Sequence, residues 1–182
     1  MLLRPLEIEG LFEITAPRNE DERGFFMRSY DRDIFAEQGL ETHWEQESLS
    51  FNARRHTVRG LHFQMPPFAE TKIVRVPRGA VIDVVLDLRK ASDTYGRHVA
   101  VKLSAENGKA LYIPTGFAHG FQTLQNETLV EYKINVAYKP ELARGVRWND
   151  PSLGIKWEAG EVRVSDRDAL LPLLSEMLEI EF

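Results

Sequence analysis

The sequence contains no cysteine among its 182 residues. This absence excludes a disulfide framework, a thiolate metal site and a cysteine nucleophile. No stretch approaches the roughly 18 uninterrupted apolar residues that a membrane-spanning helix needs. The N-terminal sequence MLLRPLEIEG also lacks the apolar run and the small-residue cleavage site of a secretory signal peptide. We therefore expect a cytoplasmic protein with no membrane partner.

Negative charge also exceeds positive charge. The 23 Lys and Arg residues are outnumbered by 28 Asp and Glu, which gives a formal net charge of -5. A nucleic-acid-binding protein would need a clustered basic face, so the charge argues against a nucleic-acid partner. An anionic small ligand would need a local group of cations. The candidate cations are Arg23, Arg59, Lys72, Arg75 and Arg78.

The chain length and the strand pattern together favour one all-β domain. A chain of 182 residues is expected to form a single domain, residues 1–182, with a substantial core. Short β-branched or alternating runs, separated by turn residues, predict a series of strands. These lie at residues 11–15, 72–76, 80–88, 97–103, 110–113, 117–124 and 128–136. Many short strands at nearly even spacing are typical of a sandwich, barrel or jelly roll.

Helical signals are few. Asp31 is suited to cap a short helix that runs to Gln38, with Gly39 just beyond its end. Segment 165–181 begins with a capping residue and has a broad apolar face, but Pro172 interrupts it. We therefore expect two short helical pieces there, peripheral to the β-structure.

Two segments match the paired hairpin signatures of the cupin fold, a small jelly-roll barrel. In the second signature, Gly108 is followed at the required spacing by Pro114-Thr-Gly-Phe-Ala-His119. The Pro-x-Gly turn re-aims the strand, so His119 is expected to point into the barrel mouth. The first signature is represented by His62-Phe-Gln64 and Lys72. The sequence thus predicts an all-β cupin jelly-roll barrel with a few short peripheral helices.

Two substitutions in the first signature argue against a bound metal. A metal-binding cupin has a second His at the position of Gln64 and a Glu at that of Lys72. An ammonium in place of a carboxylate adds positive charge, which disfavours a divalent cation. Only His62 and His119 of the usual four ligands remain, so we predict no metal. We also expect Lys72 on the strand next to His62, with an anion or a developing negative charge between them.

Ordered blocks over nearly the whole chain resemble the dTDP-4-dehydrorhamnose 3,5-epimerase family. They are Asp21–Phe26, Val58–Gln64, Lys72–Val76, Pro114–Phe121, Glu131–Lys133, Arg144–Pro151 and Ser165–Asp168. So many blocks in order are a stronger signal than any single motif. The resemblance implies a cofactor-independent isomerase of deoxysugar biosynthesis. It would invert C3 and C5 of a dTDP-4-keto-6-deoxyhexose, and its partner would be a nucleotide-diphosphate sugar.

The same resemblance implies a role for individual residues. His62 would be the general base and Asp168 its orienting carboxylate. Tyr132 would be the acid on the opposite face of the sugar, and Lys72 would stabilise the enolate oxygen. The residues that would bind the substrate are Arg23, Phe26, Arg28, Gln46, Ser48, Arg59, His119, Tyr138 and Arg167.

These residue types suit the reaction. The protons at C3 and C5 are acidic because the C4 carbonyl can take the charge as an enolate. Histidine can act as a base near neutral pH, and a carboxylate on its other nitrogen fixes the tautomer. A fixed cation aimed at the developing oxyanion can lower such a barrier by roughly 3–4 kcal/mol. Reprotonation from the other face then inverts the carbon.

A few positions depart from the usual family pattern. Arg28 stands where a Glu is common, and Ser48 where an Asn is frequent. Ala143 replaces a frequent Glu, and Arg167 replaces a Lys. In the family these positions hold the nucleotide end of the substrate. We therefore hypothesise that the proton transfer is retained while the nucleotide specificity has changed.

Several alternatives remain open. The enzyme could invert C3 alone, or act on a different nucleotide sugar, and a non-catalytic sugar-binding cupin is a less favoured class. Gln64 argues against a 3,4-ketoisomerase, and the missing ligands argue against a metal-dependent oxygenase. Members of the family form homodimers in which an N-terminal segment donates a strand and site residues to the neighbour. The predicted strand 11–15 and the nearby Arg23 fit that arrangement.

Overall fold

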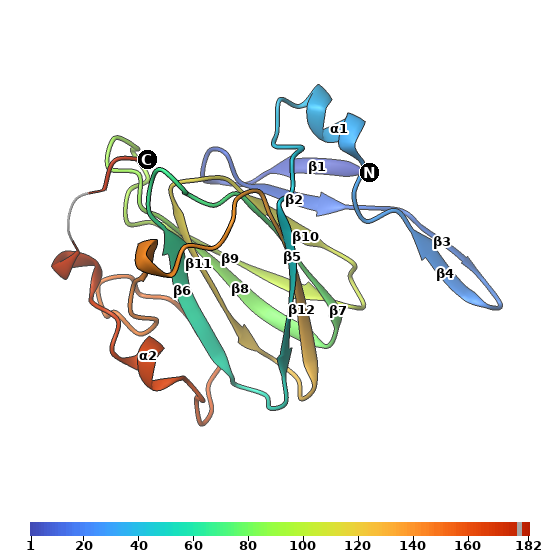
Figure 1. Cartoon of the computed structure of the whole chain (residues 1–182). Coiled ribbons are helices and arrows are strands. Elements are labelled where there is room, and N and C mark those ends of the chain that lie inside the picture. Colours follow the sequence, from blue (N-terminus) through green and yellow to red (C-terminus); the bar gives the residue numbers. More distant parts are fainter. Residues whose placement is uncertain (178–179) are drawn as a thin grey trace.

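The computed structural model describes residues 1–177 and 180–182. Two antiparallel sheets pack face to face, and a separate hairpin projects from them (Figure 1). One sheet has six strands in the order β1-β2-β10-β7-β12-β5, and the other has five in the order β13-β6-β11-β8-β9. The prediction of an all-β fold with a few short helices is confirmed. Among the described residues, no helix has the length and apolar character needed to cross a bilayer.

The bounds of the elements are as follows. The six-stranded sheet contains β1 (Leu2–Pro5), β2 (Phe12–Thr15), β5 (Gln46–Asn52), β7 (Lys72–Arg78), β10 (Ala110–Ile113) and β12 (Thr128–Ile134). The five-stranded sheet contains β6 (Val58–Gln64), β8 (Ala80–Asp87), β9 (His98–Ser104), β11 (Phe117–Thr123) and β13 (Ala143–Gly145). The hairpin is β3 (Arg18–Asp21) and β4 (Gly24–Met27), and the helical turns are α1 (Arg32–Glu37), η1 (Pro140–Leu142), α2 (Asp166–Ala169) and η2 (Leu174–Glu176).

The main core lies between the two sheets. Val74 of β7 and Val130 of β12 pack there against Val81 and Val85 of β8. Strand β8 is buried along almost its whole length because both of its faces are covered. Val81 and Val85 pack in the core between the sheets, whereas Val84 and Leu86 pack in a second cluster with Val146 and Leu153. This explains its largely apolar sequence, which is typical of a strand covered on both faces.

The two predicted helix starts are present. The Asp31 carboxylate accepts a backbone N–H of the first turn of α1. The Ser165 hydroxyl accepts the Asp168 N–H at 3.1 Å and so caps α2. Pro172 separates α2 from η2, so the tail forms two short pieces as predicted. Residues 178–179 of the predicted tail lie outside the described residues.

Strands β1, β3, β4, β5, β6 and β13 were not among the predicted ones. Strand β5 lies at a sheet edge, where alternating Ser residues and few β-branched ones give only a weak strand signal. Strand β6 contains Gly60, which is normally unfavourable in a strand interior. The β3–β4 hairpin pairs only with itself and has no apolar alternation.

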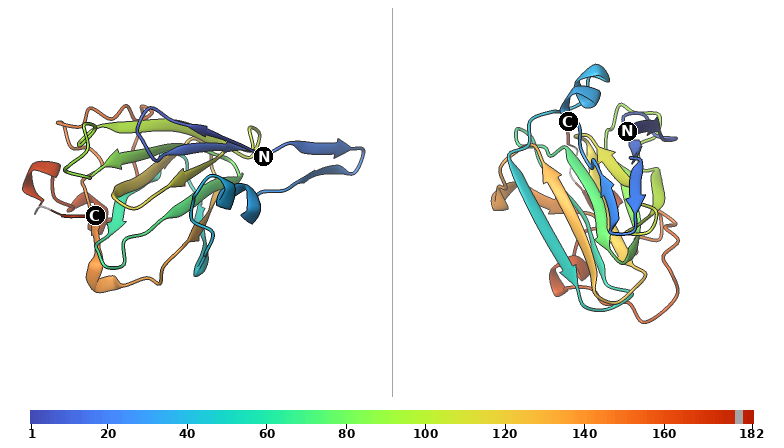
Figure 2. Two further views of the ribbon diagram at one scale, coloured as in Figure 1. Left: turned by 90° about the horizontal axis from the view of Figure 1, so that it is seen from above. Right: turned by 90° about the vertical axis from the view of Figure 1, so that its right-hand side faces the viewer.

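The strand predicted at 11–15 does not leave its own subunit. Strand β2 pairs with β1 and with β10 inside the six-stranded sheet. Its Ile14 is buried against Phe35 and Ile73, so this strand belongs to the chain's own core. The expectation that it is the donated strand is therefore wrong. The segment that projects from the body is instead the β3–β4 hairpin, as the left-hand view in Figure 2 shows.

Candidate active site

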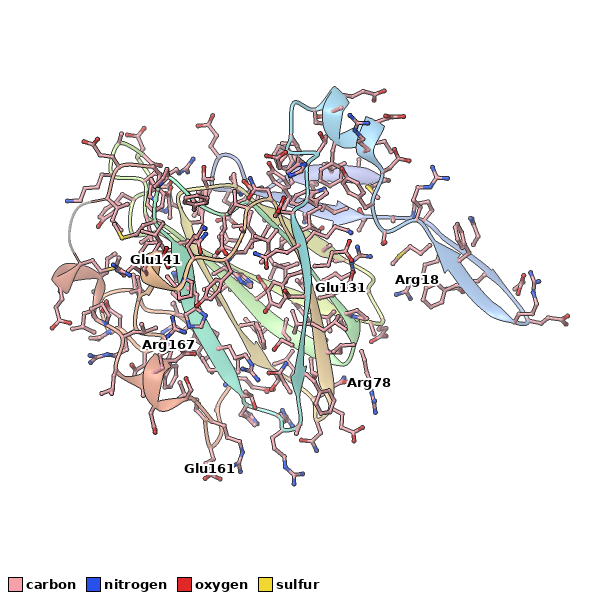
Figure 3. All side chains as sticks on the ribbon, in the orientation of Figure 1. Arg18, Arg78, Glu131, Glu141, Glu161 and Arg167 are labelled. Atoms are coloured by element: carbon pink, nitrogen blue, oxygen red, sulfur yellow. The ribbon has the colours of Figure 1, made fainter. Side chains whose placement is uncertain are left out.

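A cavity of about 420 Å³ opens between the two sheets. Strands β5, β7 and β12 supply one wall, and β6, β11 and β13 supply the other. Its volume suits a small-molecule ligand. Nine of the predicted site residues line it: Ser48, Arg59, His62, Lys72, His119, Tyr132, Tyr138, Arg167 and Asp168. Arg167, which is labelled in Figure 3, comes from α2 beside β6.

A bulge in β6 places the first histidine. His62 lies opposite His119 of β11, and the pairing then shifts before Phe121. At this irregularity Gly60 has a φ of +110°, and a Cβ there would lie 2.6 Å from the carbonyl oxygen of His119. Only glycine fits such a close, positive-φ position. The Gly60 N–H donates to Asp168 Oδ2 at 3.1 Å, so the bulge also fixes that carboxylate.

The structure brings His62 and Asp168 into direct contact. His62 Nε2 lies 2.7 Å from Asp168 Oδ1. The His62 side chain is 39% exposed, whereas that of Asp168 is 7% exposed. Burial raises the pKa of Asp168, but the hydrogen bond and charge of His62, together with the Gly60 N–H and the charge of Arg167, outweigh it and hold that pKa below its usual range. Asp168 is thus a carboxylate near neutral pH, able to orient the imidazole and to stabilise an imidazolium.

Asp168 reaches His62 because the chain before α2 is anchored along the start of β6. The Val58 N–H donates to the Arg163 carbonyl at 2.8 Å, and the Arg163 N–H donates to the His56 carbonyl at 3.0 Å. Together with the Ser165 cap, these bonds set the position of α2. The carboxylate therefore comes from a segment outside both sheets.

A second histidine–aspartate pair lies beside the first. His119 Nε2 is 2.9 Å from Asp83 Oδ2, and the two side chains are 5% and 0% exposed. Burial raises the pKa of Asp83, and the charges of His119 and Lys72 offset only part of that effect. Asp83 was not among the predicted site residues. Asp83 stands between two apolar residues of a strand predicted to be buried. A buried carboxylate needs a partner, and this requirement could have marked it as a site residue.

Lys72 lies on the wall opposite His62. Strand β7 belongs to the six-stranded sheet and β6 to the other, so the expectation that the two residues occupy neighbouring strands is wrong. The chain crosses from one sheet to the other between them. The Lys72 ammonium pairs with Glu70 at 2.8 Å, and their side chains are 11% and 9% exposed. Glu70 thus gives the Lys72 ammonium an anionic partner. The expected anion or developing negative charge between Lys72 and His62 stays a prediction.

Tyr132 projects from β12, on the same wall as Lys72. Its ring lies edge-on to that of His119, with the centroids 6.0 Å apart. Burial raises the pKa of Tyr132, and the charge of Asp83 raises it further, whereas Arg59 lowers it. The phenol therefore keeps its proton at neutral pH and can serve as an acid.

Three guanidinium groups line the cavity: those of Arg59, Arg144 and Arg167. Arg59 donates to Asn52 Oδ1 at 2.7 Å, and Arg144 donates to backbone carbonyls. Among the described residues, none of the three forms an ion pair with a carboxylate. Such a group favours an anion with several oxygens, such as a diphosphate. Arg144 was not among the predicted site residues, although it begins one of the motif blocks.

Four predicted residues do not line the cavity. Arg23 lies in the turn of the hairpin, where it bonds to Asp21, and Phe26 of β4 is 67% exposed. Arg28 pairs with Asp31 at 2.8 Å, beside α1. Gln46 donates to the Val136 carbonyl at 2.8 Å. Within residues 1–177 and 180–182, no three His, Asp or Glu side chains gather as metal ligands.

Comparison with known proteins gives a consistent result. The model of the family described as dTDP-4-dehydrorhamnose 3,5-epimerase matches residues 5–176. A protein of that name from Sinorhizobium fredii is 40% identical over 178 residues, which are 97% of this chain and 91% of that protein. A dTDP-4-dehydrorhamnose 3-epimerase from Streptomyces niveus is 41% identical over 97% of this chain and 85% of its own.

The fold has close counterparts among solved structures. One is the crystal structure of dTDP-6-deoxy-D-glucose-3,5-epimerase from Legionella pneumophila in complex with dTDP-4-keto-L-rhamnose. It matches with a TM-score of 0.94 and 34% identity, covering 100% of this chain and 98% of that one. This likeness confirms the predicted cupin jelly roll.

Proposed function

The chain belongs to the dTDP-4-dehydrorhamnose 3,5-epimerase family, and we propose how the residues of its cavity carry out the family's reaction. The reaction is an isomerisation of a dTDP-linked 4-keto-6-deoxy sugar by proton transfer. One observation carries the proposal: the His62–Asp168 pair and the Tyr132 phenol lie on opposite walls of one cavity. A base and an acid on opposite sides of a sugar are what an inversion needs.

His62 is the general base of the proposed mechanism. Its imidazole takes the proton from C3 or C5, and the electron pair of the broken C–H bond moves into the enolate, which leaves the charge on the C4 oxygen. The Asp168 carboxylate, 2.7 Å from the ring, stabilises the imidazolium that forms. The Lys72 ammonium, paired with Glu70, lies on the opposite wall and stabilises the enolate oxygen.

Tyr132 returns a proton to the same carbon from the other side. Its partly buried phenol is protonated before the step, and the guanidinium of Arg59 favours the phenolate that remains afterwards. One turn of the reaction leaves a protonated His62 and an ionised Tyr132. Exchange of both groups with water restores them, so solvent hydrogen enters the sugar at each inverted carbon.

The nucleotide end of the substrate lies at the arginines. Arg59, Arg144 and Arg167 hold the diphosphate. Arg28 is occupied by Asp31, and Ser48 replaces a longer amide, so we propose that this chain recognises the base differently from most of the family. The exposed Arg23 and Phe26 of the projecting hairpin would serve the cavity of a second subunit in a cytoplasmic homodimer.

Incorporation of deuterium from heavy water tests this function. The wild-type protein, incubated with dTDP-4-keto-6-deoxyglucose, should introduce label at both C3 and C5, and His62→Ala should abolish both. Absence of label from the wild type would refute the proposed reaction. Tight binding without label would instead identify a non-catalytic sugar-binding cupin.

The relative from Streptomyces niveus is named a 3-epimerase, so inversion at C3 alone is a second possible outcome. Label at C3 alone would place this chain with that enzyme. His62 and Tyr132 would then act as base and acid at C3 only.

A further inference from the structure

Gln64 bonds to both neighbours of Tyr138. Its side-chain Nε2 donates to the Ala137 carbonyl at 3.1 Å, and its Oε1 accepts the Lys139 N–H at 2.7 Å. The same Nε2 donates to the Phe68 carbonyl at 2.7 Å. Gln64 is only 2% exposed, so these three bonds are made away from bulk water. The amide therefore joins the chain on both sides of Tyr138 to the loop after β6.

The segment that Gln64 holds forms part of the cavity wall. Tyr138, Ala143 and Arg144 all line the cavity. Two further contacts join this segment to the chain after β6. The Lys139 ammonium lies 4.9 Å from the centroid of the Phe68 ring, and the Met65 N–H donates to the Leu142 carbonyl at 3.0 Å.

The Tyr138 side chain has little else to hold it. It is 52% exposed, and among the described residues its hydroxyl makes no hydrogen bond. Its position at the cavity therefore depends on the backbone at residues 137 and 139. Both of those residues are bonded to Gln64.

We propose that Gln64 is a positioning residue, which fixes Tyr138 at the cavity wall and thereby sets the affinity for the sugar nucleotide. The inference rests on the proposed function for its substrate. Gln64 also lines the cavity, but its amide nitrogen and oxygen are bonded to the backbone of Phe68, Ala137 and Lys139. It forms no hydrogen bond to His62, Asp168 or Tyr132, so we expect its effect on binding rather than on proton transfer. The position that carries a metal ligand in other cupins is used here to hold a loop.

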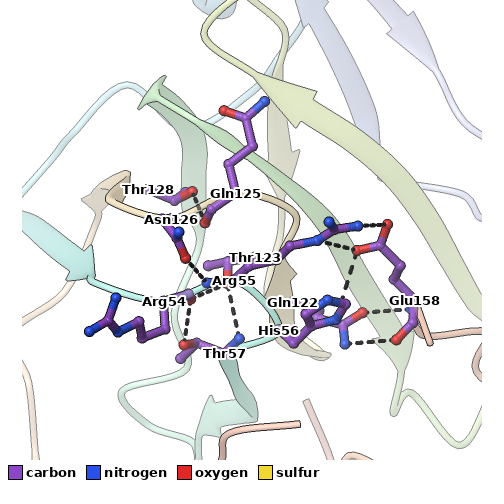
Figure 4. A network of polar contacts seen from close by, with 10 residues as sticks. All are labelled: Arg54, Arg55, His56, Thr57, Gln122, Thr123, Gln125, Asn126, Thr128 and Glu158. Carbon is purple, nitrogen blue, oxygen red and sulfur yellow. Dashed lines mark hydrogen bonds and ion pairs between the residues drawn. The ribbon is translucent and has the colours of Figure 1, made fainter. Parts of the chain in front are cut away.

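The first experiment compares two buried glutamines. Gln64→Met keeps the side-chain length but removes all three hydrogen bonds. We expect KM to rise about tenfold, equivalent to about 1.4 kcal/mol, with kcat changed less than about threefold, the pattern of lost uniform binding. The matched control is Gln122→Met. Gln122 is 0% exposed. Its side chain donates to the Glu158 carbonyl at 3.1 Å and accepts the Glu158 N–H at 2.6 Å (Figure 4).

Gln122→Met should destabilise the fold to a similar degree yet leave KM within about twofold of the wild type. An equal rise of KM in both variants would show that general loosening of the fold is responsible, and would overturn the proposal. A fall in kcat with unchanged KM in Gln64→Met would overturn it as well.

The second experiment tests whether Gln64 acts through Tyr138. In a Tyr138→Ala background, Gln64→Met should change KM less than about twofold, because the side chain that it positions is gone. A full tenfold effect in that background would refute the link. Hydrogen exchange gives a readout without substrate: the Lys139 amide should lose protection in Gln64→Met and keep it in Gln122→Met.

The two proposals can fail separately. If the wild type introduced no deuterium into the sugar, the proposed function would be wrong. The same variants would then be compared by the dissociation constant of dTDP-glucose, measured by calorimetry, which needs no turnover. A larger dissociation constant for Gln64→Met alone would support the positioning role. Equal dissociation constants for all variants would refute it.

Discussion

Two histidine–aspartate pairs lie side by side, with their histidines on β6 and β11, and they are alike in geometry but opposite in surroundings. His62 and His119 are direct cross-strand partners, and the Nε2 atom of each lies within 3.0 Å of a carboxylate. His62 is 39% exposed to the cavity, whereas His119 is 5% exposed. The pKa of Asp168 is lowered, and that of Asp83 is raised.

The difference teaches that contact alone does not make a catalytic pair. The pair that faces the cavity can exchange protons with a substrate and with water, and its carboxylate stays ionised. His119 also lines the cavity, but its partner Asp83 is fully buried and has no access to water. The charge of Asp83 instead acts on Lys72 and Tyr132, so it shapes the electrostatics around the two groups that meet the enolate and the returning proton.

The largest effect expected from this comparison is on the histidines. His62→Asn removes the base, and we expect deuterium exchange at C3 to fall about 10³-fold. His119→Asn should lower it only about tenfold, since this ring contacts substrate without taking its proton. Equal losses in the two variants, measured by mass spectrometry of the recovered sugar, would contradict the distinction by exposure.

A smaller effect is expected from the carboxylate of the catalytic pair. Asp168→Asn retains the side-chain shape but cannot stabilise an imidazolium, so kcat should fall about 10²-fold. The fall should be greatest in kcat, with KM nearly unchanged, because the lost interaction exists mainly in the transition state. The matched variant is Asp83→Asn, which should retain at least about a tenth of the wild-type kcat. A greater loss in Asp83→Asn than in Asp168→Asn would reverse the assignment of the two pairs.

The smallest expected effect is on the pH dependence of the free energy of unfolding, which should differ between variants of Asp168 and Asp83. The lowered pKa of Asp168 gives a contribution that is present above the unfolded pKa and lost as pH falls through the folded one. Asp168→Asn should therefore cost about 2 kcal/mol at pH 7, with the deficit shrinking toward about pH 3.

Asp83 should behave in the opposite way. Its raised pKa means that the ionised form costs stability, and that cost is relieved as pH falls. Because Asp83→Asn has no such cost at any pH, its stability relative to the wild type should worsen toward low pH. Urea unfolding of both variants between about pH 3 and pH 7 would show the two slopes. Slopes of the same sign would contradict the contrast.

Much of the fold followed from local patterns. The buried strand around Val84, the alternating strand around Val99 and the capped turns at Asp31 and Ser165 all appeared where the sequence placed them. The weak strand β5 and the self-paired hairpin escaped prediction. Their stability depends on pairing across the sequence rather than on local propensity.

The candidate site was predictable by motif but not by geometry. His62, His119 and Asp168 could be named from the sequence, yet the sheet crossing that puts Lys72 opposite His62 could not. Nor could the bulge at Gly60, which depends on how two strands meet. Glu70 and Asp83 were missed because the role of each depends on a partner, Lys72 and His119 respectively, that only the fold brings near.

The way Asp168 is delivered has a consequence for how this enzyme can evolve. Within the described residues, the last strand of either sheet ends at Gly145, so the strand pairing of the scaffold is encoded before the residue that tunes the base. The segment that carries Asp168 and orients His62 is thus added to the two sheets rather than being one of their strands. Val146 and Leu153 of the intervening segment pack in the core of the five-stranded sheet. Substitutions at the exposed positions of that segment are therefore the ones that can shift the carboxylate while leaving the strand pairing untouched. Such modularity gives a lineage room to adjust reaction rate and stereochemical outcome in small, separable steps.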